Sequence, residues 1–246
     1  MSNYRMKIQY DGTRYKGWQR QRSGADTIQG RIEAVLSRLT GEPAEIDGAG
    51  RTDAGVHAWE QVANVHLTEG CEPRWLHQKL NEYLPEDIRI MEVKEVSERF
   101  HSRLNATGKI YEYRLLKKGC CDVFRRKYAW NMDDTLDIEK MRLAAEQLKG
   151  QHDFKGFCTK ASKKKSTIRR IDDIEIVDEG SGITLRFTGN GFLYNMVRIL
   201  TGTLVEIGTG ERRAETIPHI LQSGERQCAG QTAPAKGLML KKVLYD

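Results

Sequence analysis

The chain has 246 residues, enough for one large or two small globular domains, and 39% of them are hydrophobic, so a sizeable core can form. Forty basic against thirty-four acidic residues leave a net charge of +6 and an isoelectric point near 9.0. Such a balance favours a polyanionic partner, above all nucleic acid, because clustered Lys and Arg bind phosphates with release of counterions. No apolar run reaches the roughly 18 residues of a membrane span, and the N-terminus lacks the apolar core of a signal peptide. We therefore expect a cytoplasmic protein with no membrane partner.

The cysteines are odd in number, and none has the C-x-x-C spacing of a zinc or redox site. We expect reduced, partly buried thiols, with no disulfide framework and no bound metal. The residues concerned are Cys71, Cys120, Cys121, Cys158 and Cys228.

The first hundred residues predict alternating strands and helices. Apolar residues at every second position indicate strands, and apolar residues three or four apart indicate helices. Asp26 and Gln29 resemble a capping box at the start of the first helix. The predicted elements are a strand over 6–10, a helix over 28–39, a strand over 61–67, a helix over 75–83 and a strand over 88–93.

The remaining residues repeat this mixture. We expect a strand over 109–115, a helix over 137–149 closed by Gly150, a hairpin of strands 171–177 and 183–188, a long helix over 192–207 and a short helix over 218–222. The pattern predicts an α+β protein of two similar domains, residues 1–104 and 105–246.

The stretch GAGRTDAGVHA, residues 48–58, contains the first candidate for chemistry. It fits neither the phosphate-binding P-loop nor the dinucleotide motif. Arg51 lies two residues before Asp53, and a cation so close would lower the pKa of the carboxyl and keep it ionised, as a nucleophile requires. The glycines would let a substrate atom approach the backbone. A surface loop with a local Arg–Asp pair is the alternative.

The helix expected over 192–207 is almost entirely apolar, so we expect it to be mostly buried. Arg198, one of its two charged residues, would then need a carboxylate partner beside a cleft. Asp53 is a natural candidate, although Asp11 and Asp153 compete with it. An exposed Arg198 is the alternative.

Tyr111 and Tyr113 share one face of the strand over 109–115, because side chains alternate along a strand. Exposed aromatic residues on a sheet stack on unpaired bases. Leu115 lies on the same face and favours burial, so at most one of the two tyrosines is expected to stack.

Three basic segments could follow a phosphate backbone: residues 14–22, which include Trp18, residues 125–127 and residues 160–170. Each could equally be a solvated face. His57 and His152 are acid–base candidates without metal-ligand spacing, and for both we expect a structural role first.

The motif GRTDAGVHA is similar to the active-site motif of the bacterial tRNA pseudouridine synthase A (TruA) family. Segments resembling others of that family follow in the same order from end to end: YDGTRYKGWQRQ, TIQGRIEAVL, LNEYLPEDIRI, FHSRLNATGKIYEYRL, GQHDFKGFC, TIRRI, GNGFLYNMVRILTGTLVEIGTG and APAKGLMLKKVLY. The resemblance implies two similar domains whose antiparallel sheets join into an extended central sheet with helices on one side.

The same resemblance implies an isomerase that converts uridine to pseudouridine at positions 38, 39 and 40 of the tRNA anticodon stem-loop. Asp53 would be the nucleophile, and Arg51 would occupy the space of the flipped-out nucleotide and help to hold it. Tyr111 would pack against the target base and assist removal of the proton from C5, and Arg198 would pair with the catalytic acid. Members of the family act as homodimers without metal or cofactor. Attack at uracil C6, attack at sugar C1′ and elimination to a glycal all stay open.

Two departures from the family pattern bear on the target. Gly156 stands where the family commonly has serine, and the proline usually found near Val123 is missing. These departures concern substrate contacts or loop shape, and not the nucleophile. Two other functions compete: a non-catalytic RNA-binding or RNA-folding module, and an aspartate-dependent hydrolase, which would need a second carboxylate or a metal.

Overall fold

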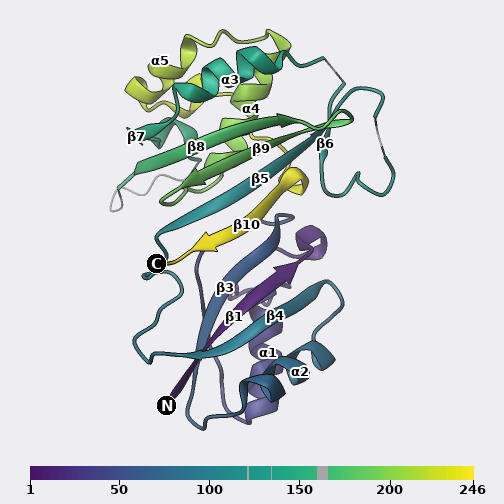
Figure 1. The fold of residues 1–246 in the computed structure, drawn as a ribbon, viewed down its shortest axis with the longest axis vertical. Helices are drawn as coiled ribbons and strands as arrows, with labels where there is room; N and C mark the ends of the chain where they lie inside the picture. Colours follow the sequence, from purple (N-terminus) through teal and green to yellow (C-terminus); the bar gives the residue numbers. More distant parts are fainter. Residues whose placement is uncertain (121, 134, 160–165) are drawn as a thin grey trace. The chain divides into compact units, whose positions relative to one another are not determined.

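The computed structural model describes residues 1–120, 122–133, 135–159 and 166–246. The chain divides into two compact units. The first comprises Met1–Thr107 together with Met239–Asp246, and the second comprises Gly108–Leu238. Both units combine helices with a mostly antiparallel sheet, which confirms the predicted α+β class (Figure 1).

In the first unit, β1 (Ser2–Tyr10) lies between β3 (His57–Leu67) and β4 (Ile88–Val96), antiparallel to both. On its other side β3 pairs with the short β2 (Ile46–Gly48), which is antiparallel, and with β10 (Leu238–Leu244), which is parallel. Figure 1 shows β10, in yellow, beside β3. The last strand of the chain therefore joins the sheet of the first unit. Neither β2 nor β10 was predicted.

Two helices complete the first unit. In α1 (Ile28–Thr40), Ile28, Ile32 and Leu36 are at most 1% exposed, which confirms the predicted apolar stripe. The second helix, α2 (Pro73–Tyr83), packs along β4.

The predicted capping box of α1 is wrong. The cap is Thr27, whose hydroxyl accepts the N–H of Gly30 at 3.3 Å. Asp26 is instead paired with Arg31 through two hydrogen bonds of 2.6 and 2.7 Å. The Gln29 side chain is used elsewhere, in contacts with Gln19 and Glu33.

The sheet of the second unit has the order β5 (Gly108–Leu116), β9 (Gly182–Gly189), β8 (Ile168–Asp178) and β7 (Gly150–Asp153), and each neighbouring pair is antiparallel. The predicted hairpin is the β8–β9 pair. The two-residue β6 (Trp130–Asn131) runs parallel to the end of β5.

The helices of this unit are α3 (Ile138–Glu146), α4 (Met196–Thr209) and α5 (Thr216–Ser223). Helix α3 packs against α4 and β8, and α4 also contacts β5. Short 3-10 turns occur in both units: η1 (Gly12–Arg14), η2 (Lys155–Phe157), η3 (Arg226–Cys228) and η4 (Ala235–Gly237).

Two predicted helix boundaries in the second unit are wrong. Helix α3 ends at Glu146, and Gly150, with a φ of +96°, begins β7 instead of closing the helix. Helix α4 begins at Met196 and not at Phe192, because Asn195 has a φ of +60° and breaks the helical path. In both helices the helical spacing of apolar residues extends beyond the observed boundary, so the spacing alone overestimated the helical segment. The backbone conformation sets the boundary that is observed.

Candidate active site

The loop that carries Asp53 is fastened to the strand that follows it. The N–H of Ala49 donates to the carbonyl of Val62 at 2.8 Å. The fully buried amide of Gln61 donates to the carbonyl of Gly50, also at 2.8 Å. The loop therefore leaves β2 along a path fixed by hydrogen bonds.

Residues 15–18 hold the same loop from the other side. The N–H of Trp18 donates to the carbonyl of Thr52 at 3.0 Å, and the N–H of Gly55 donates to the carbonyl of Tyr15 at 3.3 Å. Gly17 has a φ of +97°, and a Cβ there would lie 2.8 Å from the Thr52 oxygen. Only glycine permits this approach. Gly17 therefore allows residues 15–18 to lie in close contact with the motif loop.

Asp53 opens a tight turn. The N–H of Val56 donates to the Asp53 carbonyl at 3.1 Å, and Gly55, the third residue of the turn, has the positive φ of +78° that a type II turn requires. The hydroxyls of Thr52 and the buried Tyr10 are 2.8 Å apart, and burial raises the pKa of Tyr10. Asp53 itself is half-buried. A fixed backbone with a partly accessible carboxylate is suited to nucleophilic attack.

Arg51 is exposed. Its guanidinium forms no ion pair or hydrogen bond with any residue that the structure describes. An Arg51–Asp53 contact, on which both the nucleophile interpretation and its surface-loop alternative relied, is therefore not found in the described chain. An arginine that the protein leaves unneutralised is available to an anionic ligand.

The two tyrosines of β5 differ in their surroundings. Tyr113 is fully buried, its hydroxyl donates to the Pro234 carbonyl at 2.7 Å, and burial raises its pKa. Tyr111 is 7% exposed and meets Phe192 edge to face, with 5.2 Å between ring centroids. Tyr113 is therefore a core residue, and Tyr111 is also buried, so neither tyrosine is the exposed aromatic that was expected and the contact of Tyr111 with a base stays a prediction.

Arg198 lies on α4, which is mostly buried, as predicted. Its half-buried guanidinium donates from Nε to the Ala233 carbonyl at 2.7 Å and from Nη1 to Asn195 Oδ1 at 3.0 Å. Asp153, one of its three candidate partners, is exposed and accepts the N–H of Lys155 at 3.0 Å. The pairing of Arg198 with Asp53 stays a prediction. Arg51 and Asp53 belong to the first unit, and Tyr111 and Arg198 belong to the second.

The two histidines contact backbone groups. His57 is 2% exposed, and its Nδ1 accepts the N–H of Gly12 at 3.1 Å and lies 3.0 Å from Asp11 Oδ1. His152 Nε2 lies 2.8 Å from the Lys149 carbonyl, and its ring meets Phe154 edge to face. These contacts agree with the structural roles expected for both.

The basic segment over residues 14–22 is only partly free. Arg14 pairs with Asp87 at 2.6 Å, and Arg20 is 3.0 Å from Glu33. Trp18 is 1% exposed and belongs to the core, so it offers no stacking surface.

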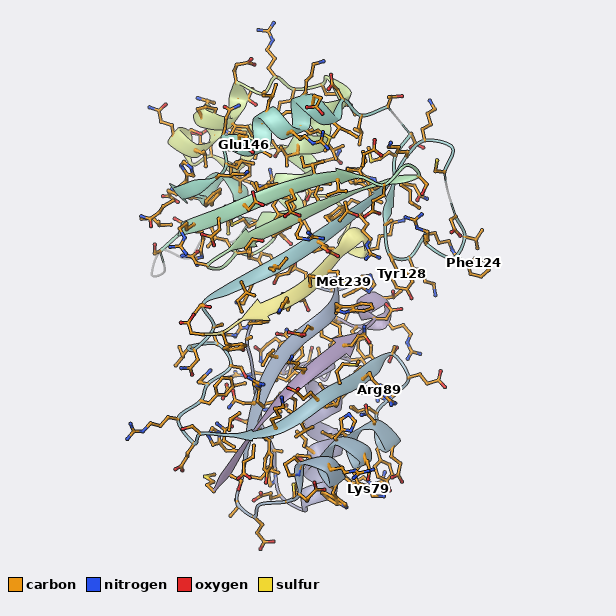
Figure 2. All side chains as sticks on the ribbon, in the orientation of Figure 1. Lys79, Arg89, Phe124, Tyr128, Glu146 and Met239 are labelled. Carbon is orange, nitrogen blue, oxygen red and sulfur yellow. The ribbon has the colours of Figure 1, made fainter. Side chains whose placement is uncertain are left out.

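The other two basic segments belong to the second unit. Arg125 donates to the Ser181 hydroxyl at 3.0 Å. Phe124, just before it, is 87% exposed and points away from the ribbon (Figure 2). Of the third segment, residues 160–165 lie outside the described residues, and Arg170 pairs with Asp172 at 2.6 Å.

Sequence reasoning missed a groove of about 640 Å³ on the first unit. It is lined by residues 18–22, by β2, by Arg51 and by the connection that follows β4, including His101 and Arg103. The only signal for the last two residues was their place in the family-like segment FHSRLNATGK. His101 and Arg103 lie far along the chain from residues 18–22, so the sequence did not show that the two segments line one groove.

Some structural features bear on metals and membranes. Among the residues that the structure describes, no three His, Cys, Asp or Glu side chains are grouped so that they could hold a metal ion. The described helices include none long and apolar enough to cross a bilayer. Cys71, Cys120, Cys158 and Cys228 are free thiols, and Cys121 lies outside the described residues.

Known proteins resemble this chain along its whole length. A family model described as tRNA pseudouridine synthase matches residues 6–105 and 144–246. Proteins named tRNA pseudouridine synthase A from Bacillus sp. strain KSM-64, tRNA pseudouridine synthase A 2 from Bacillus anthracis and tRNA pseudouridine synthase A 1 from Clostridium tetani are 48%, 44% and 46% identical. Each alignment covers 100% of both chains.

Two solved structures give weaker likenesses. A Cbf5–Nop10–Gar1 complex aligns with 13% identity and a TM-score of 0.38, over 96% of this chain and 57% of that one. An archaeal Nop10–Cbf5 complex aligns with 13% identity and a TM-score of 0.36, over 94% and 58%. The assignment therefore rests on the sequence matches. By these matches the chain belongs to the tRNA pseudouridine synthase family and is an isomerase that makes pseudouridine in tRNA.

Proposed function

We propose that the enzyme modifies uridines 38, 39 and 40 in the anticodon stem-loop of tRNA, with Asp53 as its nucleophile. The observation that carries the proposal is the way the motif loop is built. Hydrogen bonds from both sides fix the backbone around Asp53, while its side chain stays partly accessible. A nucleophile has to be held in this way, because small misplacements of reacting groups cost large factors in rate.

The target base has to leave the RNA helix before it can react. A paired uridine does not present its glycosidic bond, so the nucleotide must be turned out into a pocket, at a cost of a few kcal/mol. We assign to Arg51 the space that the nucleotide leaves. Its exposed guanidinium, which has no partner in the described chain, supports that role. We assign to Tyr111 the contact with the extruded base.

Arg198 is proposed to pair with the Asp53 carboxylate. Its two other contacts leave the guanidinium half-buried with a fixed orientation. An oriented cation would keep the carboxylate ionised and aligned for attack.

The reaction rearranges bonds within one nucleotide. The bond between uracil N1 and sugar C1′ breaks, and a bond between uracil C5 and C1′ forms. The hydrogen on C5 is lost to solvent, and N1 regains a proton. Asp53 can attack C6, attack C1′ or promote elimination to a glycal, and each of these routes needs the ionised carboxylate.

The test replaces Asp53 by Ala and by Asn. Both variants should release no tritium above background from tRNA labelled at uridine C5, while filter binding of the same tRNA stays close to wild type. Asp153→Asn is a matched control on an exposed aspartate and should keep full activity. Turnover near the wild-type rate in Asp53→Ala would reject the nucleophile.

A second measurement addresses the target positions. Carbodiimide mapping of tRNA from a strain that lacks the gene, before and after its return, should show pseudouridine at positions 38 to 40 only when the gene is present. RNA bound without any mass-neutral change would instead support the binding or folding module. Cleavage products would support a hydrolase.

We further propose a homodimer that acts in the cytoplasm on the anticodon arm. Sedimentation equilibrium of the free enzyme should give twice the mass of the chain. A monomer that is fully active at the same concentration would contradict this assignment.

A further inference from the structure

We propose that the groove on the first unit binds backbone phosphates of the RNA strand next to the target uridine. This inference rests on the proposed function, because Arg51 both lines the groove and belongs to the loop of Asp53. At about 640 Å³, the groove falls within the size range of ligand pockets, so it can hold nucleotide-sized groups. Its charged lining consists of Arg20, Arg22, Arg51 and Arg103 against Glu45 and Asp47, with His101 beside them.

Three of these arginines are held without a counter-charge. Arg22, Arg51 and Arg103 are exposed, and in the described part of the chain their guanidiniums form no ion pair or side-chain hydrogen bond. Like charges gathered in a concave surface repel one another and raise the local concentration of anions. Guanidinium groups also match phosphate oxygens in geometry and bind them through paired hydrogen bonds. An anionic ligand with several oxygens therefore fits this wall.

The fourth arginine is fixed by the protein core. Arg20 Nη1 is 3.0 Å from Oε2 of Glu33, whose side chain is only 4% exposed. The other oxygen of Glu33 accepts the N–H of Ile46 at 3.0 Å and the amide of Gln29 at 2.8 Å. The Glu33 carboxylate is buried and held by Ile46 and Gln29, so it is a fixed anchor for the ion pair with Arg20. Arg20 is thereby held over the groove, where it also reaches Glu45 at 2.8 Å.

Gln29 fixes the backbone of the same wall. Its Oε1 accepts the side-chain amide of Gln19 at 2.6 Å and the backbone N–H of Arg20 at 3.0 Å. Its own backbone N–H donates to the Trp18 carbonyl at 3.0 Å. The start of α1 therefore positions the basic segment before any RNA is bound. Gln29 and Glu33 are positioning residues, which act through Arg20.

The lining favours phosphates over bases. Trp18 lies behind Gly48, where an added Cβ would come within 2.6 Å of the indole Nε1, so its ring is not available for stacking. Of the two acids of the groove, Glu45 pairs with Arg20 at 2.8 Å, and Asp47 lies 3.9 Å from His101 Nε2, an ion pair only when the imidazole is protonated. The contacts that remain are charge-based, so binding here should be independent of sequence and sensitive to salt.

The first test measures tRNA affinity as a function of salt, with Arg22→Ala, Arg103→Ala and the double variant made in the Asp53→Ala background. Each single variant should raise Kd about three- to tenfold and lower the slope of log Kd against log salt by about 0.7 to 1. Arg74→Ala, which removes an exposed arginine of α2 outside the groove, should change neither. A slope that stays at the parent value in both single variants would overturn the inference.

Because the groove variants are made in the Asp53→Ala background, this inference can fail independently of the proposed function. Binding is measured without turnover, so the salt slopes judge the groove whether or not Asp53 is the nucleophile. If Asp53→Ala retains activity while the slopes fall, the nucleophile is wrong and the groove stands. If Asp53→Ala is inactive and the slopes do not change, the groove is wrong and the nucleophile stands.

The second test addresses Glu33. Glu33→Gln keeps the shape of the side chain and removes its charge, so KM for tRNA should rise about as much as in Arg20→Ala, with kcat near wild type. The double variant Arg20→Ala/Glu33→Gln should be no worse than Arg20→Ala alone, because Glu33 acts through Arg20. If Glu33→Gln lowers only the melting temperature and leaves KM unchanged, Glu33 is a purely structural residue and the positioning role fails.

Discussion

The two arginines assigned to the active site are held in opposite ways. Arg51 is exposed on a loop and has no partner in the described chain. Arg198 is half-buried on an apolar helix and bound by the carbonyl of Ala233 and the amide oxygen of Asn195. The comparison separates an exposed guanidinium without a partner in the described chain from one whose orientation is fixed by hydrogen bonds within the protein.

The two regions also obtain their order from different sources. The loop around Asp53 is held by backbone hydrogen bonds to residues 15–18 and to β3, together with glycines that allow close contact. Helix α4 is held by burial of apolar side chains such as Leu200 and Leu204, which are fully buried. Substitutions should therefore damage the loop through geometry and the helix through packing and lost hydrogen bonds.

Among the substitutions that test this comparison, Arg198→Ala is expected to have the largest effect. The variant should lower kcat by about 10² or more, as loss of an oriented charge does at other active sites. It should also lower the free energy of unfolding by about 1 to 3 kcal/mol, because the carbonyl of Ala233 loses its donor. Single-turnover kinetics and urea denaturation measure the two effects.

Arg51→Ala is the matched control for this comparison. It should lower activity while leaving the free energy of unfolding within about 0.5 kcal/mol of wild type, because no described residue loses a partner. If it destabilised the protein as much as Arg198→Ala does, the contrast between an exposed guanidinium and one fixed by hydrogen bonds would be lost.

A smaller effect is expected at the glycines that shape the loop. Gly17→Ala would place a Cβ 2.8 Å from the Thr52 carbonyl oxygen, and should lower kcat about 10- to 100-fold by displacing the residue before Asp53. Gly24 also has a positive φ, of +72°, but nothing lies within 4 Å of a Cβ there. Gly24→Ala should cost about 1 kcal/mol of stability from backbone strain and leave kcat unchanged. Equal loss of kcat in both variants would show that strain, and not contact with the loop, is responsible.

The smallest effect concerns pH. Burial, with a 2.6 Å hydrogen bond to Asp87, raises the pKa of Tyr15 from 10.0 to about 12. The folded state thus favours the neutral hydroxyl, so this stabilisation is complete below pH 10 and is lost as pH rises through 12. Urea denaturation between pH 9 and 11.5 should show a shallower decline for Tyr15→Phe than for wild type. Tyr83→Phe, at a tyrosine 41% exposed, should keep the wild-type slope.

Local patterns predicted much of the secondary structure. Alternation along β1, the apolar stripe of α1 and the turn between β8 and β9 were readable, because each depends on residues close together in the chain. The short strands β2, β6 and β7 carried too few residues to show a period. The end of α3 and the start of α4 were misjudged, because apolar spacing does not report the positive φ of Gly150 or of Asn195.

By itself the sequence determined the α+β class, the basic character and the family, and it identified Asp53, Arg51, Tyr111 and Arg198 as candidates. It also predicted that α4 would be buried, because a helix with so few charges has no face for water.

Only the tertiary structure decided how these residues are held. The anchoring of Thr52 by Trp18, the tie between Arg20 and Glu33 and the meeting of residues 18–22 with residues 101–104 join positions far apart in the chain. The same holds for the pairing of β10 with β3. The physical reason is that hydrogen bonds and ion pairs are set by distance in space, and periodicity in a sequence reports only which face of an element is apolar.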